Sequence, residues 1–307
     1  MRRPFFQIRV DRLAMSLAQL IPLLINISII LIVFSLGLKT ERGDTVYLLS
    51  RPWLLVRSIL SMNVIMAAVT ATLAKLLELP FAVELTLIAL AISPVPPILP
   101  TKQRKAGGSA SYAVSLLAFA SLAAIVLAPF AVEVIGAWFG RQTGISSGAV
   151  ARIVLVTVLA PLVAGIAVRI CLPEFAARIA RPASVIGTAL LVAAALPVLF
   201  TATTAIWTLV GNGVVLALVA FALIGLAIGH CLGGPEPESR AVLALATGTR
   251  HPGVAIAIAS ANFPDEKAAL AVVLYHLVIG ALVSIPYVKW SRKRAEAARQ
   301  VGAGTRP

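Results

Sequence analysis

Apolar residues fill most of the chain, in runs of about 20 residues separated by short stretches that carry the charged residues. As an α-helix, a run of that length crosses the hydrocarbon core of a bilayer, so the pattern predicts a series of membrane-spanning helices. One apolar stretch of over 40 residues is too long for a single helix, and we place a turn in it near Gly211-Asn212-Gly213. The nine predicted spans cover residues 13–38, 51–77, 80–100, 109–138, 148–172, 184–206, 209–232, 238–262 and 267–290.

The composition agrees with this pattern and excludes a soluble domain of any size. Of the 307 residues, 60% are hydrophobic and 12% are charged, and the mean hydropathy is +0.98. A net charge of +14 would suit nucleic-acid binding, but the basic residues are scattered through short loops and both termini and do not form a face with aromatic residues. We therefore expect the lipid bilayer, and no nucleic acid, as the partner of these charges.

The cysteines and the N-terminus predict neither a cofactor nor processing. Cys171 and Cys231 are far apart and lie near predicted helix ends, so we expect no disulfide framework, no metal site and no cofactor. Residues 1–4 are basic, but the apolar run that follows is long enough to span the membrane and has no small-residue cleavage site. No cleavable signal is predicted.

The distribution of Lys and Arg predicts the orientation in the membrane. If the N-terminus lies outside, the inner loops and C-terminal tail hold 16 basic residues and the outer segments hold 8, while Arg57 and Arg250 lie within spans. Because basic residues concentrate on the cytoplasmic side, this bias predicts an external N-terminus and a cytoplasmic C-terminus in the plasma (bacterial inner) membrane. Four basic residues at the N-terminus oppose this orientation.

Residues 246–253 interrupt the eighth span with an arginine, a histidine and a proline. Pro252 has no amide hydrogen and also restricts His251, so the helix breaks or kinks here. Non-helical backbone at membrane depth persists only inside protein or beside a water-filled cavity. A charged residue at such a break, here Arg250, indicates a functional site. The alternative is a kinked helix whose arginine reaches an interface.

A second interruption lies in the third span, where residues 93–100 cannot form a continuous helix. The alternative is a proline-rich loop after a shorter helix. Spans 1–4 and 6–9 form two groups of four, each broken span is the third of its group, and the intervening fifth span inverts the second group. Paired interruptions of this kind mark the midplane site of a transporter. The predicted helix-breaking residues are Pro94, Pro96, Pro97, Pro100 and Pro252.

Several short motifs, in order along the chain, resemble those of the bile acid:sodium symporter family. They are Phe34-Ser35-Leu36-Gly37-Leu38, Arg51-Pro52, Leu79-Pro80, Pro161-Leu162 with Gly165 and Arg169, and Gly248 with Gly253-Val254-Ala255. The resemblance covers essentially the whole chain and implies an all-α polytopic membrane protein of nine transmembrane helices, with two inverted four-helix repeats whose discontinuous helices cross. It also implies one membrane domain, residues 1–307, with a core subdomain (about 51–140 and 209–290) and a panel subdomain (about 13–38 and 148–208).

The residues that bind sodium in this family are largely absent. The family has a glutamate four residues before a glutamine in its second crossing helix, where this chain has Ala246 and Arg250. The other substituted positions are His251 for an asparagine, Val95-Pro96 for a glycine pair, Leu99-Pro100 for serine-asparagine, Met62 for a glutamine, and Ala113 and Leu117 for hydroxyl ligands. Because sodium needs several oxygen ligands, the resemblance implies the fold and the substrate location but not the coupling ion.

Arg250 is the leading candidate for substrate binding, because its planar guanidinium can hold a carboxylate through two parallel hydrogen bonds. His251 has three possible roles: it binds substrate, it gains and loses a proton, or its side chain makes an orienting hydrogen bond to backbone groups that Pro252 leaves without a helical partner. His276 and Asn63 are further candidates, although packing and interhelical hydrogen bonding are their commoner roles. No residue is assigned a catalytic or metal-binding role. The candidate substrate-binding residues are Arg250, His251, Thr249, Gly253, Ser93, Pro97, Asn63 and His276.

These features predict a secondary transporter of small organic anions, carboxylates in particular, that works by alternating access and without sodium. Two half-helix N-termini at a crossing would present unpaired amides and positive dipole ends to an anion. The alternatives are a sodium- or proton-coupled organic-anion symporter, an auxin-efflux-type carrier, a non-transporting membrane receptor, and an intramembrane enzyme that uses His251 or His276. The sequence has no paired aspartates, Ser/His dyad motif or metal-ligand spacing to support an enzyme.

Overall fold

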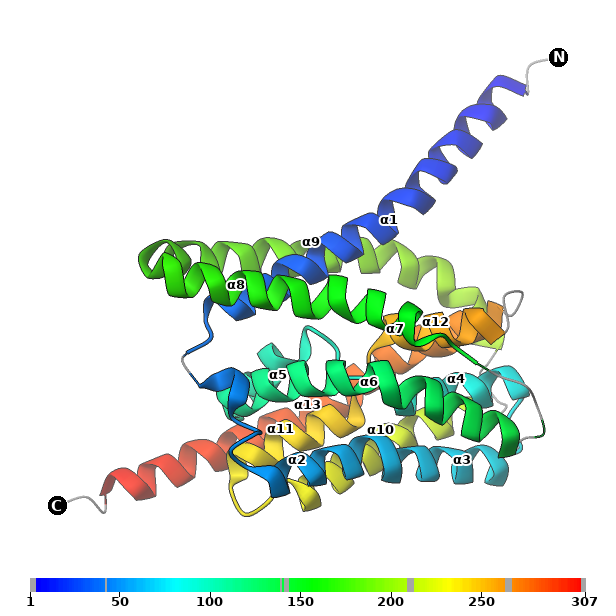
Figure 1. The fold of residues 1–307 in the computed structure, drawn as a ribbon. Helices are drawn as coiled ribbons and strands as arrows, with labels where there is room; N and C mark the ends of the chain where they lie inside the picture. The colour runs from blue at the N-terminus through cyan, green and yellow to red at the C-terminus, as the bar shows by residue number, and fades with distance from the viewer. Residues whose placement is uncertain are drawn as a thin grey trace. The chain divides into compact units, whose positions relative to one another are not determined.

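All regular elements in the described part of the chain are helices, which confirms the predicted all-α fold (Figure 1). The computed structural model describes residues 4–41, 43–138, 140, 144–208, 213–262 and 267–304. In chain order the elements are α1 (Pro4–Leu38), the 3-10 helix η1 (Asp44–Val46), α2 (Pro52–Ile59), the π-helix η2 (Leu60–Ile65), α3 (Met66–Leu76), α4 (Phe81–Ile92), α5 (Leu99–Lys105), α6 (Ala110–Trp138), α7 (Ser147–Val154), the π-helix η3 (Leu155–Leu159), α8 (Ala160–Cys171), α9 (Pro173–Thr208), α10 (Val214–Leu232), α11 (Pro237–Gly248), α12 (Pro252–Asn262) and α13 (Lys267–Gly304).

Eight helical stretches among the described residues are long and apolar enough to cross a membrane. They correspond to eight of the nine predicted spans when α2 with α3, α7 with α8, and α11 with α12 are each counted as one stretch. The third predicted span contains α4, whose described apolar part, Val83–Ile92, is shorter. At 1.5 Å per residue, 12 residues rise only about 18 Å, because the prolines after Ser93 stop the helix. The turn predicted near Gly211-Asn212-Gly213 falls mostly outside the described residues.

Three helices extend beyond their predicted spans, and the first of them, α1, begins at Pro4 instead of 13. α9 begins at Pro173 instead of 184, and α13 continues to Gly304 instead of ending at 290. The segments added to α9 and α13 are rich in Ala and Arg, which are strong helix formers. In α13, Arg292 pairs with Glu296 one turn later at 3.0 Å. A search for apolar runs leaves out such polar continuations.

One compact unit comprises residues 1–39 and 160–201, and in it α1 packs closely against α8. A Cβ atom on Gly37 would lie 2.4 Å from the Leu162 carbonyl oxygen, and one on Gly165 would lie 2.4 Å from that of Phe34. Cβ atoms do not come so close, so both positions require glycine for this helix contact. Both glycines belong to the motifs that resemble the symporter family.

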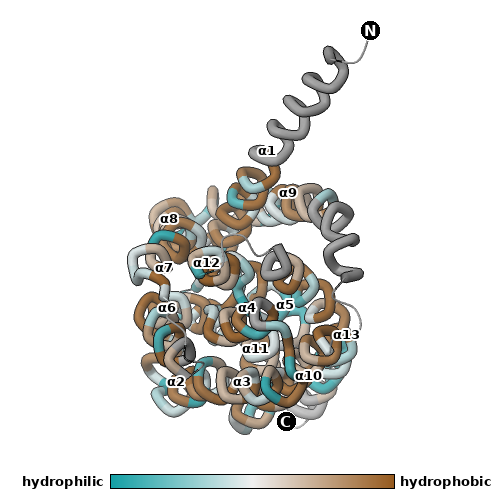
Figure 2. The backbone as a smooth tube through the Cα atoms, turned by 90° about the vertical axis from the view of Figure 1, so that its right-hand side faces the viewer, coloured by the Kyte–Doolittle hydropathy of each residue, from teal (hydrophilic) through white to brown (hydrophobic). Residues whose placement is uncertain are grey.

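The second compact unit comprises residues 40–159 and 202–307. Figure 2 shows α4, α5 and α11 in the interior of this unit, with α2, α3, α6, α10 and α13 around them. Buried apolar side chains from α4, α6, α10, α12 and α13 form most of its core. Residues 93–97, between α4 and α5, are buried, and so are Arg250 and His251, between α11 and α12, so protein surrounds the backbone at both interruptions.

A row of glycines on α10 brings this helix into backbone contact with α11. Cβ atoms on Gly225, Gly229 and Gly233 would lie 2.7 Å from the Gly248 Cα, 2.5 Å from the Leu243 carbonyl oxygen and 2.5 Å from the Arg240 Cα, respectively. Gly225 and Gly229 lie in α10 and Gly233 directly follows it, and the spacing of four residues places the three glycines along one face. Small residues at this spacing are typical of close helix packing in membranes.

Candidate functional site

The third predicted span is interrupted by six residues without helical structure, 93–98, between α4 and α5. Ser93 is extended, with φ −68° and ψ 150°. The prolines in the interruption, Pro94, Pro96 and Pro97, have no amide hydrogen to continue a helix. Pro100 differs from the prediction, because it lies in the first turn of α5, where proline is tolerated, and does not break a helix.

The eighth predicted span is interrupted by Thr249, Arg250 and His251, between α11 and α12. Thr249 is extended, with φ −131° and ψ 129°. Pro252 is the first residue of α12, a position whose amide hydrogen has no partner within a helix. The discontinuity predicted near residues 249–253 is therefore confirmed.

The two interruptions lie in direct contact. The amide of His251 donates a hydrogen bond to the Pro94 carbonyl oxygen at 3.0 Å, and Nη1 of Arg250 donates to the Ser93 carbonyl oxygen at 3.3 Å. α4 packs against α12, and α5 packs against α11. Segments 157 residues apart thus meet at one site, as predicted for crossing discontinuous helices.

Arg250 is completely buried, and its guanidinium faces backbone carbonyls from two other spans. Nη1 bonds to Ser93, at the C-terminal end of α4, and Nη2 bonds to the carbonyl of Met62 in η2. The end of α4 carries the negative pole of that helix, so a cation is favoured there. The amide of Met66 bonds to Ser61, five residues back, and this leaves the Met62 carbonyl without its usual α-helical donor.

The charge of Arg250 is not balanced by an acidic residue. In the part of the chain that the structure describes, its hydrogen-bond partners are carbonyl oxygens, and no carboxylate pairs with it. Its Nε atom is buried without a hydrogen-bond partner. The described residues also include no group of three or more His, Cys, Asp or Glu side chains that could hold a metal ion. The site therefore offers a buried positive charge with one nitrogen, Nε, that has no hydrogen-bond partner.

His251 uses its side chain to cap α12. Nδ1 accepts hydrogen bonds from the amides of Gly253 (3.1 Å) and Val254 (3.4 Å), while Nε2 is buried without a partner. Of the roles considered for His251, the structure thus shows the orientation of backbone next to Pro252. The expectation that this helix end presents unpaired amides to an anion is wrong for Gly253 and Val254, because His251 occupies both.

His276 lies on α13, buried with only 1% of its surface exposed. Its ring meets the ring of Phe221 edge to face, with 5.2 Å between the centroids. In the described part of the chain, neither ring nitrogen has a hydrogen-bond partner. Phe221 belongs to α10, so the structure shows the His276 ring packed between α13 and α10.

The remaining predicted residues differ in their contacts. The Ser93 hydroxyl donates to the Ala89 carbonyl oxygen at 2.6 Å, so it is engaged within its own helix. Asn63 is half-buried in η2, next to the Met62 carbonyl that Arg250 binds. The other three are Thr249 and Gly253, which are half-buried, and Pro97, which is buried.

Three groups of the site were not predicted from the sequence, although the family resemblance marks position 62 as that of an ion ligand. One is the Met62 carbonyl, because every residue has a carbonyl and nothing in the side chain marks the one that is used. The others are Ser61 and Thr247, whose hydroxyls share a hydrogen bond of 2.7 Å and join the second span to α11. The hydroxyl pair could be suspected only from buried polar residues within apolar spans, a pattern that many other positions share.

The comparison with known families agrees with this geometry. The sequence model for the Sodium Bile acid symporter family matches residues 26–204, more than half of the chain. The chain belongs to the sodium bile acid symporter family. Members of this family are membrane transporters and not enzymes, so the protein is an integral membrane transporter. No curated protein matches the chain.

The match to the sodium bile acid symporter family covers one of the two breaks. The family match includes the first break, at residues 93–98, and ends before the second, where Arg250 and His251 lie. At Met62, where the family resemblance places a sodium-binding glutamine, the protein contributes a backbone carbonyl to Arg250. A guanidinium is thus bound at a position where the resemblance implies ion ligands.

Proposed function

We propose that the protein is a secondary transporter of small organic anions, carboxylates in particular, that works by alternating access and does not need sodium. Family membership supports transport. The proposal includes a core subdomain, about residues 51–140 and 209–290, and a panel subdomain, about 13–38 and 148–208. The observation that carries the sodium independence is the position of the Arg250 guanidinium.

Arg250 occupies carbonyl oxygens that would otherwise suit a metal cation. Oxygen atoms, backbone carbonyls included, are the ligands that hard cations prefer, and here the carbonyls of Ser93 and Met62 accept from the guanidinium. A second cation about 4 Å from the guanidinium would be repelled by roughly 4 kcal/mol at an effective dielectric of 20, which is about a thousandfold in affinity. Sodium and Arg250 therefore exclude each other at these oxygens.

The same buried charge favours an anionic substrate. A buried cation without a counter-charge is costly, and a carboxylate next to the free Nε of Arg250 would supply both a counter-charge and a hydrogen-bond acceptor. His251 already binds the first amides of α12, so we expect side chains and not these amides to hold the anion. The residues proposed to line the substrate site are Arg250, His251, Thr249, Gly253, Ser93, Pro97, Asn63 and His276.

Thermal unfolding of purified protein in sodium-free choline buffer tests this proposal. A ligand that binds only the native state raises stability, by about 2.7 kcal/mol at one hundred times its dissociation constant. We expect some members of a panel of small carboxylates to raise the melting temperature and their neutral amide analogues to leave it unchanged. Arg250→Ala should abolish the carboxylate-induced shift, measured from the variant's own unliganded melting temperature, whereas Arg250→Lys should keep part of it because the charge remains.

A matched control is Arg152→Ala, which removes an exposed arginine from α7. This variant should respond to carboxylates as the original protein does. An equal shift in Arg250→Ala and the original protein would place the substrate elsewhere. Stabilisation by carboxylates only after sodium is added would contradict the exclusion of sodium by Arg250.

A further inference from the structure

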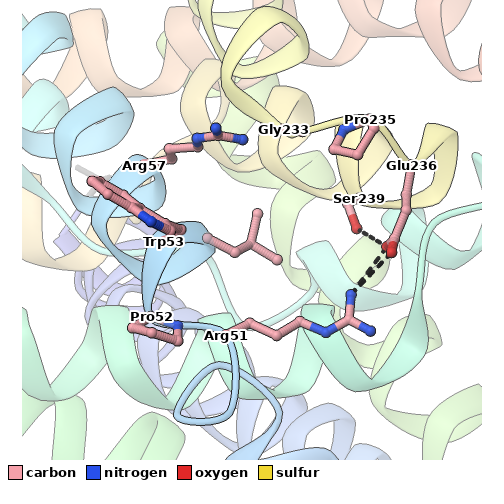
Figure 3. Close-up of a pocket in the computed structure, with 10 residues that line it drawn as sticks. Arg51, Pro52, Trp53, Arg57, Gly233, Pro235, Glu236 and Ser239 are labelled. Atoms are coloured by element: carbon pink, nitrogen blue, oxygen red, sulfur yellow. Dashed lines mark hydrogen bonds and ion pairs between the residues drawn. The ribbon is translucent and has the colours of Figure 1, made fainter.

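A second site with unused positive charge lies where α2 begins and where the chain turns from α10 into α11 (Figure 3). A cavity of about 260 Å³ opens there, and all of its lining residues belong to the second compact unit. The lining residues that matter for the argument are Arg51, Trp53, Arg57, Gly234, Glu236 and Ser239.

The two arginines that line this cavity differ in whether an acidic residue pairs with them. Arg51 pairs with Glu236 at 3.1 Å and lies over the Tyr47 ring, 4.5 Å from its centroid. Arg57 is exposed, and within the described residues it has neither a hydrogen bond nor an ion pair. Figure 3 shows its guanidinium pointing across the cavity towards the turn that contains Gly233. The cavity is therefore lined by one arginine, Arg57, whose charge is not paired with a carboxylate of the described residues.

The surface next to Arg57 is apolar and exposed along one face of the second span. Trp53, Arg57, Leu60 and Val64 follow at intervals of four, three and four residues, which places them on a single helical face. Trp53 is 75% exposed, Leu60 39% and Val64 56%. A tryptophan at the end of a span is typical of the level of the lipid headgroups, and the apolar residues beyond it are typical of contact with acyl chains.

We propose that this cavity binds the headgroup of an anionic phospholipid, with the phosphate on Arg57 and the acyl chains along Leu60 and Val64. The free guanidinium selects a negative headgroup, because a zwitterionic one would also bring a cation towards Arg51 and Arg57. The apolar face selects a lipid over a soluble anion, because the cavity opens onto surface that only acyl chains would cover favourably. Basic pockets next to spans bind anionic headgroups in other membrane proteins.

Native mass spectrometry of delipidated protein, titrated with phosphatidylglycerol, tests this proposal. We expect Arg57→Gln to weaken binding of the first lipid about fivefold, the contribution of one basic residue at a membrane surface. Arg152→Gln is the matched control: Arg152 is exposed and, like Arg57, is the sixth residue of a 25-residue span. Binding to this control should equal binding to the original protein. Phosphatidylcholine should bind more weakly to the original protein and show no difference between the variants.

Glu236→Gln gives an independent prediction of opposite sign. Removal of the carboxylate frees Arg51 for the phosphate, so phosphatidylglycerol should bind more tightly by a similar factor. This variant keeps the proposal testable if Arg57→Gln fails to fold. Equal binding of phosphatidylglycerol to Arg57→Gln and Arg152→Gln would overturn the proposal. So would unchanged or weaker binding of this lipid to Glu236→Gln. Full displacement of the lipid by millimolar inorganic phosphate would also overturn it, because the site would then bind a soluble anion. A dimer that is lost on Trp53→Ala and excludes lipid would also overturn it.

Discussion

At the scale of single residues, two neighbours in the second break bind different backbone groups. Arg250 donates to carbonyls at the end of α4 and in η2, whereas His251 accepts from amides at the start of α12. Each side chain satisfies backbone groups that an unbroken helix would have paired internally. Arginine has only hydrogen-bond donors, so it binds carbonyl oxygens such as the one at the C-terminal end of α4. The neutral histidine ring has one acceptor nitrogen, so it can bind the amides at the N-terminal end of α12.

The capping role of His251 predicts the effect of replacing it. His251→Ala removes the acceptor for the amides of Gly253 and Val254 and should destabilise the protein by about 1 kcal/mol, as loss of an N-cap does. His251→Asn keeps an acceptor near the same position and should recover most of this loss. Thermal unfolding of the purified variants measures both. Equal melting temperatures for His251→Ala and the original protein would show that the cap contributes nothing.

At the scale of elements, prolines set where helices stop and glycines set how closely helices approach. The prolines in residues 94–97 end α4 after 12 residues, and Pro252 begins α12. The glycines of α10 place α10 and α11 in backbone contact, next to the break that holds Arg250. The position of the broken helix thus depends on small residues that lie outside the proposed substrate site.

This contact predicts different effects for two Gly→Ala variants in helices. Gly229→Ala places a Cβ atom 2.5 Å from the Leu243 carbonyl oxygen and should lower stability by about 1–3 kcal/mol, as overpacking does. In Gly280→Ala, the nearest atom to the new Cβ belongs to His276, at an ordinary 4.0 Å, so this control should be neutral or slightly stabilising. The melting temperatures of both variants and the original protein, measured in the same detergent, test this prediction. If Gly229→Ala is as stable as Gly280→Ala, α10 can shift without cost.

The elements show which parts of the structure the sequence could predict. Hydrophobic runs located the spans, and the prolines located both breaks, because these signals are local. The contact of Arg250 with Met62 joins residues 188 apart, and no side chain at Met62 marks its carbonyl as an acceptor. The η2 π-helix that frees this carbonyl has the same composition as an ordinary apolar helix. The start of α9 and the end of α13 lie outside the predicted spans because helix propensity, not hydrophobicity, extends these helices.

At the scale of the whole molecule, the basic residues predict an external N-terminus and a cytoplasmic C-terminus. The chain has two cysteines, Cys171 and Cys231, and both are exposed near the ends of α8 and α10. In the predicted orientation both lie on the cytoplasmic side. A membrane-impermeant maleimide should therefore label neither in intact cells and should label them after permeabilisation.

A positive control for this labelling is Ser147→Cys, which adds an exposed thiol at the start of α7, on the predicted outer side. It should react in intact cells. Labelling of Cys171 or Cys231 from outside, with none at position 147, would reverse the orientation.

The central claim is that Arg250 takes the place of a bound cation in an organic-anion carrier. Uptake into proteoliposomes tests it most directly, with a labelled carboxylate chosen because it stabilises the purified protein. The flux is measured at fixed pH with sodium fully replaced by potassium or by choline. We expect the same substrate-gradient-driven flux in all three salts, and none in protein-free liposomes. A flux that requires sodium would contradict the claim.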